Sequence, residues 1–190
     1  AVDHLNPEGV LELGRLGVAI GNGEAVMESA RLIKSRDEIL AMRRAIIACE
    51  AAMGEMEAAL VPGISENELW AELHRGNIVR GGEWIETRLL ASGPRTNPWF
   101  QECSSRRIEA GDLVAFDTDL IGPYGFCADL SRTFFCGDGQ PTTDQRELFS
   151  IAADQIAHNT ALIRPGIGFR DLVERSSIPP PDCFPTRYGV

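Results

Sequence analysis

The stretch 111–133 constrains the fold more than any other part of the chain. Two segments rich in Val, Phe, Thr and Leu flank a turn at 121–125 that contains Gly and Pro, which predicts a β-hairpin. Side chains alternate between the faces of a strand, so Asp117 and Asp119 are expected on one face. The hairpin then brings Asp129 opposite one of them, where facing Cβ atoms lie about 5 Å apart. The sequence therefore predicts three carboxylates directed at one small volume.

Three converging carboxylates repel one another unless a positive charge lies among them. Two like charges about 4 Å apart cost ~4 kcal/mol near a protein surface. A divalent cation, or two cations that share a bridging carboxylate, removes this cost. Oxygen ligands suit Mg, Mn and Fe, and carboxylates also serve Zn. The hairpin therefore predicts a metal site, and the alternative is a solvated edge strand with three surface acids.

The same residues resemble the metal-binding motif of the pita-bread metallohydrolases, the family of methionine aminopeptidases, prolidase, aminopeptidase P and creatinase. That family has Asp-x-Gly, a loop, and then Gly-Tyr-x-x-Asp-x-x-Arg-Thr. This chain has Asp117-Thr118-Asp119 and then GFCADLSRT at 125–133. Asp119 replaces the usual Gly, and the spacing from Asp117 to Asp129 is one residue longer. Both departures resemble the branch that cleaves dimethylsulfoniopropionate (DMSP), in which the additional Asp is a metal ligand.

The resemblance implies an α+β pita-bread fold, with a curved, mostly antiparallel sheet and helices on its outer side. It implies two bound metal ions, Fe being favoured over Zn, Mn or Co, with Asp117, Asp119 and Asp129 among the ligands. Tyr188 is a candidate for substrate contact, because a Tyr in the corresponding segment contacts substrate in the DMSP-cleaving branch. Trp99 is a second candidate, because an aromatic ring face attracts a cationic sulfonium group.

The function that this resemblance implies is a lyase that converts DMSP to dimethyl sulfide and acrylate by β-elimination. The catalytic base of that branch is expected beyond residue 190. A dinuclear prolidase or aminopeptidase is the alternative. In those peptidases the loop at 92–100 presents a His, whereas this chain has Trp99 and Phe100 there. A third alternative, from another class, is a metal-free pita-bread module that only binds partners.

Charge and composition narrow the choice of partners and compartment. The net charge is −10, and no basic stripe is present, so nucleic acid is not expected as a partner. No apolar run approaches 18 residues, so no membrane span is expected. The five Cys form no CxxC motif, which favours a reducing, cytoplasmic location. We expect a homodimer that acts on a small sulfonium substrate.

The domain organisation is predicted from turn signals and from the resemblance. Residues 1–30 are expected to be the end of an N-terminal domain and a linker, with either a short helix or a strand at 10–20. Residues 31–190 are expected to be the N-terminal part of the metal-binding domain. Because the chain begins with Ala and ends at 188–190 like an unfinished strand, we expect a fragment of a longer protein.

Local patterns predict three long helices and a strand. Capping boxes at Ser35 and Ser65 begin helices that run to about Leu60 and Val79, and Thr142 or Thr143 caps a third that runs to about Ile163. Residues 84–90 alternate like a strand. The predicted buried stripe of the first helix is Ile39, Met42, Ile46, Cys49, Met53, Met56 and Leu60. The predicted apolar side of the third helix is Leu148, Ile151, Ala152, Ile156 and Leu162.

Overall fold

Two capped helices carry a large part of the core in the computed structural model, which describes residues 5–181. α3 (Arg36–Ala59) begins after Ser35 and α4 (Glu66–Ile78) begins after Ser65. At each start the Ser hydroxyl accepts from the backbone N–H three residues on, and the Glu there accepts from the Ser N–H. Both predicted capping boxes are therefore confirmed.

Small residues let these helices approach each other and the sheet. A Cβ atom placed on Gly76 of α4 would lie 2.6 Å from the Cβ of Ala52 on α3. A Cβ placed on Gly122, in the turn of the hairpin, would lie 2.7 Å from the Cβ of Ala45. Separations this short exclude any larger side chain at either glycine without a shift of the helix backbone.

The stripe predicted for α3 is wrong in its first half. Ile39 and Ile46 are 44% and 36% exposed, whereas small side chains are buried instead. The buried face is Ala45, Ala48, Cys49, Ala52, Met53 and Met56. Apolar periodicity favours the larger residues, but close helix packing selects alanine, which sequence patterns place equally well on either face.

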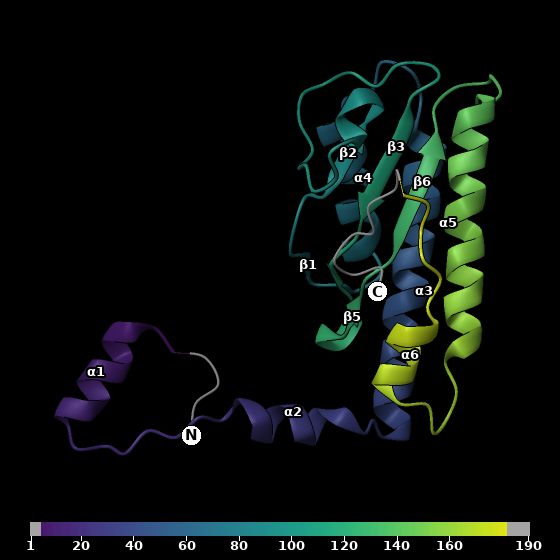
Figure 1. Ribbon diagram of the computed structural model, residues 1–190. Coiled ribbons are helices and arrows are strands. Elements are labelled where there is room, and N and C mark those ends of the chain that lie inside the picture. The colour runs from purple at the N-terminus through teal and green to yellow at the C-terminus, as the bar shows by residue number, and fades with distance from the viewer. Residues whose placement is uncertain (1–4, 182–190) are drawn as a thin grey trace.

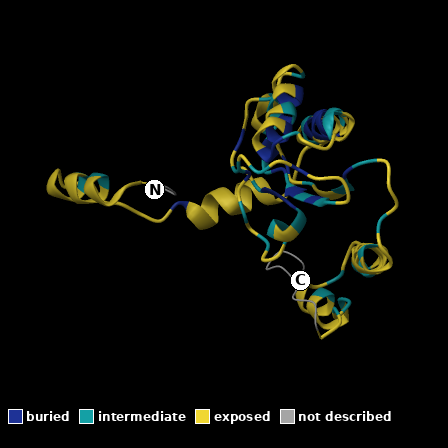
Figure 2. Cartoon of the chain, turned by 90° about the horizontal axis from the view of Figure 1, so that it is seen from above, coloured by how far each residue is buried: buried dark blue, intermediate teal, exposed yellow. Residues whose placement is uncertain are grey.

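Short strands form two antiparallel sheets of three strands each (Figure 1). The first sheet has the order β1 (Trp84–Ile85), β4 (Leu120–Ile121), β5 (Cys127–Ala128). The second has the order β2 (Leu90–Ser92), β3 (Leu113–Asp117), β6 (Ser131–Phe135). The buried residues gather where α3 and α4 meet these sheets (Figure 2).

The predicted strands are interrupted, and this corrects the sequence interpretation. The strand predicted at 84–90 is two strands in different sheets, because residues 86–89 between β1 and β2 are not in a strand. Each predicted arm of the hairpin is also broken at its acidic residues. The predicted turn is confirmed at Pro123–Gly125, where Tyr124 and Gly125 have a positive φ of 67° and 71°.

The third predicted helix is confirmed as α5 (Thr143–Leu162), with Thr142 as its N-cap. α6 (Phe169–Arg175) follows it. The expected apolar side of α5 is not buried: Leu148 and Ile156 are 54% and 68% exposed. An apolar cavity of about 580 Å³, lined by residues of both elements, lies between α5 and β6.

The N-terminal region contains two helices with no buried residue, α1 (Pro7–Arg15) and α2 (Glu24–Leu32). Both extend away from the rest of the chain (Figures 1 and 2). The segment 10–20 is therefore helical only as far as Arg15, and the boundary predicted at residue 30 stays a prediction. Within residues 5–181, no helix has the length and apolar character needed to cross a bilayer.

Candidate metal centre

The three acids lie where both arms of the hairpin leave the sheet. The pairs Asp117–Ser131 and Leu120–Ala128 belong to one continuous register, so Asp119 falls opposite Asp129 across the gap. The prediction that Asp129 faces one of the other acids is therefore confirmed. The backbone path of the hairpin differs from the prediction, because Asp119 lies outside any regular strand.

Asp119 has a left-handed backbone with φ of +36°. This conformation costs most residues about 1–2 kcal/mol, whereas Gly adopts it freely and Asp tolerates it better than most. Gly at the position of Asp119 would therefore adopt this backbone without strain. Asp119 keeps the turn and adds a carboxylate to it.

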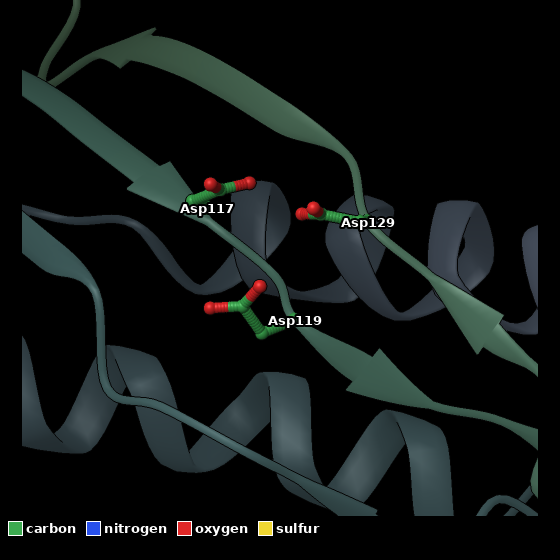
Figure 3. Close-up of side chains that lie close together, drawn as sticks. All are labelled: Asp117, Asp119 and Asp129. Atoms are coloured by element: carbon green, nitrogen blue, oxygen red, sulfur yellow. The ribbon is translucent and has the colours of Figure 1, made fainter. Parts of the chain in front are cut away.

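Asp117, Asp119 and Asp129 each offer an oxygen atom, and these atoms all lie within 4.8 Å of one another. Asp117 and Asp129 point toward each other from facing arms of the hairpin, and Asp119 turns toward the same space (Figure 3). Neutral hydroxyl groups orient two of the three carboxylates. Thr87 Oγ1 donates to Asp119 Oδ2 at 2.7 Å, and Ser131 Oγ donates to Asp117 Oδ1 at 2.9 Å.

The electrostatics of the cluster favour a bound cation. Desolvation of its carboxyl group raises the pKa of Asp129 to about 6, and a hydrogen bond with Asp117 and the charges of Asp117 and Asp119 act in the same direction. A divalent ion removes this repulsion, and three carboxylates form a donor set that suits Mg, Mn, Fe or Zn. The residues present therefore fit a metal ion.

A buried carboxylate organises the loop that carries Trp99. Glu66, at the start of α4, is fully buried and accepts from the N–H and hydroxyl of both Ser92 and Ser104, and from the Arg95 guanidinium. Burial raises the pKa of Glu66, but the hydrogen bonds from Ser104, Ser92 and Arg95 outweigh it and hold the pKa below its ordinary value. Glu66 thus fixes both ends of the loop.

Of the two candidate substrate contacts, Trp99 lies within the described residues and Tyr188 does not. Trp99 is half-buried, with its ring centroid 6.1 Å from that of Phe100, which is 47% exposed. Its contact with substrate stays a prediction. Tyr188 lies outside the described residues, and the catalytic base is only predicted beyond residue 190, so both also stay predictions.

Two hydroxyl residues that orient the acids, Thr87 and Ser131, were not predicted from the sequence, and neither was Glu66, which holds the loop. The partners of these three residues lie 14 or more positions away in the sequence. The hairpin itself contained one signal. Thr118 lies between Asp117 and Asp119, so strand alternation places its side chain on the opposite face, toward the core.

The fold and the hairpin that carries the three acids agree with the comparisons with known proteins. The chain belongs to metallopeptidase family M24, whose model matches residues 40–176. A prolidase from Pyrococcus furiosus has the same fold, with a TM-score of 0.79 at 24% identity over 88% of this chain and 50% of that chain. The α+β pita-bread fold expected from the resemblance is therefore confirmed.

Two relatives within this class are more similar in sequence. A dimethylsulfoniopropionate lyase from Roseovarius nubinhibens is 49% identical over 93% of this chain, and one from Roseobacter denitrificans is 42% identical over 100%. The chain spans only 41% and 43% of the lengths of these relatives. A Xaa-Pro dipeptidase from Pyrococcus furiosus is 29% identical over 77% of this chain and 42% of the relative.

Proposed function

We propose that this protein is a metal-dependent lyase that cleaves DMSP to dimethyl sulfide and acrylate. The observation that carries the proposal is the third carboxylate, Asp119, which stands within 4.8 Å of Asp117 and Asp129. The sequence similarity to two dimethylsulfoniopropionate lyases supports the same conclusion.

Asp117, Asp119 and Asp129 would hold two metal ions together with ligands beyond this chain, and we favour iron, with Zn, Mn or Co as alternatives. When bound, the ions would act as Lewis acids toward the substrate carboxylate. Thr87 and Ser131 keep two of the acids in place through the hydrogen bonds described above.

In the proposed elimination, a base beyond residue 190 takes a proton from the carbon next to the substrate carboxylate. The C–H electron pair forms the double bond of acrylate, and dimethyl sulfide leaves with the electrons of the C–S bond. The ring face of Trp99 would attract the sulfonium cation by about 0.5–2 kcal/mol. Tyr188 is the second proposed contact with this substrate.

Headspace gas chromatography of the protein as its gene encodes it, supplied with DMSP, tests the proposal. We expect dimethyl sulfide from the metal-loaded protein and none after removal of metal by a chelator. Asp119→Asn should lower the rate sharply, because it removes a charged ligand with little change in shape. Asp138→Asn, in an exposed turn, is the matched control and should leave the rate unchanged. Absence of dimethyl sulfide from the loaded protein would refute the proposal.

A prolidase or aminopeptidase activity is the second candidate. It is favoured by the 29% identity to a Xaa-Pro dipeptidase and by the fold shared with a prolidase. Release of proline from an X-Pro dipeptide, with no dimethyl sulfide from DMSP, would support this activity in place of the lyase.

A homodimer and a cytoplasmic location complete the proposal. Analytical ultracentrifugation of the protein tests the oligomeric state, and fractionation of the cells that produce it tests the location. Metal analysis of protein purified without chelator tests the preference for iron.

A further inference from the structure

A buried hydroxyl lies in the middle of the interrupted hairpin. Thr118, between two of the acids, has no solvent exposure. Its Oγ1 accepts from the N–H of Leu130 at 2.9 Å and donates to the carbonyl of Ala128 at 3.2 Å. Leu130 and Ala128 are the two chain neighbours of Asp129. One side chain therefore binds the backbone on both sides of the third acid.

The orientation of this hydroxyl is fully determined. A hydroxyl has one donor and two acceptor positions. The third position of Thr118 Oγ1 is filled by the thiol of Cys49, whose Sγ lies 3.6 Å away. Cys49 is buried on α3, so the same atom connects both arms of the hairpin to the helix beneath them. With all three positions filled, the hydroxyl has no alternative set of partners.

These bonds replace the sheet at the point where the sheet stops. β3 and β6 pair up to Asp117–Ser131, and β4 and β5 resume pairing at Leu120–Ala128. Between the two pairs the backbone is not in a strand, and its polar groups must be satisfied in another way. Without the hydroxyl, the N–H of half-buried Leu130 and the carbonyl of buried Ala128, on either side of Asp129, would each lose a partner.

We propose that Thr118 is the positioning residue of the acid cluster, and that its hydroxyl sets the distance from Asp129 to Asp117 and Asp119. The inference rests on the proposed metal-dependent function and adds a residue that does not touch the metal. Removal of a group that orients a metal ligand commonly weakens metal binding about 10–100-fold.

The test uses the protein as its gene encodes it, stripped of metal and titrated with Mn²⁺ by calorimetry. Thr118→Val keeps the shape and removes the hydroxyl, so we expect Mn²⁺ binding about 10–100-fold weaker. Thr118→Ser keeps the hydroxyl and should bind within about 3-fold of the wild type. Thr142→Val removes the N-cap of α5, and it should lower thermal stability and leave Mn²⁺ affinity unchanged.

Hydrogen exchange of the metal-free protein gives a second readout. The amide of Leu130 should exchange faster in Thr118→Val than in the wild type, because its acceptor is gone, and Thr118→Ser should restore the slow exchange. If Thr118 only filled the core, Thr118→Ser would lose stability because it lacks the methyl group, Thr118→Val would keep its stability, and the Mn²⁺ affinity of the folded protein would be unchanged in both.

The outcomes separate this inference from the proposed function. Wild-type protein that binds no Mn²⁺ refutes the metal site, and with it any positioning role. Wild-type protein that binds Mn²⁺ no more tightly than Thr118→Val, or Thr118→Ser that binds as weakly as Thr118→Val, refutes the positioning role alone. Unchanged exchange at Leu130 in Thr118→Val refutes it as well.

Discussion

Glu66→Gln tests whether a buried carboxylate holds the loop between β2 and β3. One carboxylate oxygen accepts from Ser92 N at 2.9 Å and Ser92 Oγ at 2.7 Å, and the other accepts from Ser104 N at 2.9 Å, Ser104 Oγ at 2.7 Å and Arg95. Glutamine supplies only one acceptor oxygen, and its NH₂ group must face a backbone N–H of either Ser92 or Ser104. At least one buried donor is then left without a partner.

The expected cost follows from these bonds. An unsatisfied buried N–H costs about 1–3 kcal/mol, and loss of one charge from a buried ion pair costs about 3–5 kcal/mol. Arg95 is partly exposed and keeps bonds to Ser104 Oγ and to the carbonyl of Glu102, which reduces the cost of the lost charge. We therefore expect Glu66→Gln to lower the free energy of unfolding by roughly 3 kcal/mol.

Urea denaturation followed by circular dichroism measures this change. Glu57→Gln, on the exposed side of α3, is the control and should stay within about 0.5 kcal/mol of the wild type. The pKa of Glu66 is lowered on folding, so its contribution is present above the ordinary value of 4.5 and is lost as the pH falls through the lowered value. The difference between Glu66→Gln and wild type should therefore shrink in acid. A difference below about 0.5 kcal/mol at neutral pH would refute the reasoning.

Three further predictions concern the acids and the loop. In metal-free protein the pKa of Asp129 rises from 3.8 to about 6 on folding, so the free energy of unfolding should fall as the pH rises through this window. Asp129→Asn should remove about 1 kcal/mol of this pH dependence, after allowance for solvent screening. Equal pH profiles for variant and wild type would contradict this. Asp119→Gly should be about 1 kcal/mol more stable than Asp119→Ala in urea, because Gly adopts a φ of +36° freely; an alanine variant of equal stability would count against the strain. Trp99→Leu should raise KM for DMSP roughly 2- to 30-fold with Trp99→Phe closer to wild type, and unchanged KM in Trp99→Leu would remove Trp99 from the site.

Local sequence signals predicted the elements well where the chain interacts with itself over short distances. Ser35, Ser65 and Thr142 begin their helices as expected, because a capping box involves only residues three positions apart. The convergence of the acids was also predictable, because hairpin register follows from the turn. The exposed apolar side of α5 and the shifted buried face of α3 were not predictable from periodicity, which does not specify what each face packs against.

The sequence alone determined that Asp117, Asp119 and Asp129 belong to one hairpin, because strand alternation and a turn are short-range properties. Only the tertiary structure decided how those carboxylates are held. The chain leaves the sheet at the acids, and the hydroxyls of Thr87 and Thr118 bind across gaps of many residues. Such contacts depend on how separate segments pack, and no spacing within a single segment records them.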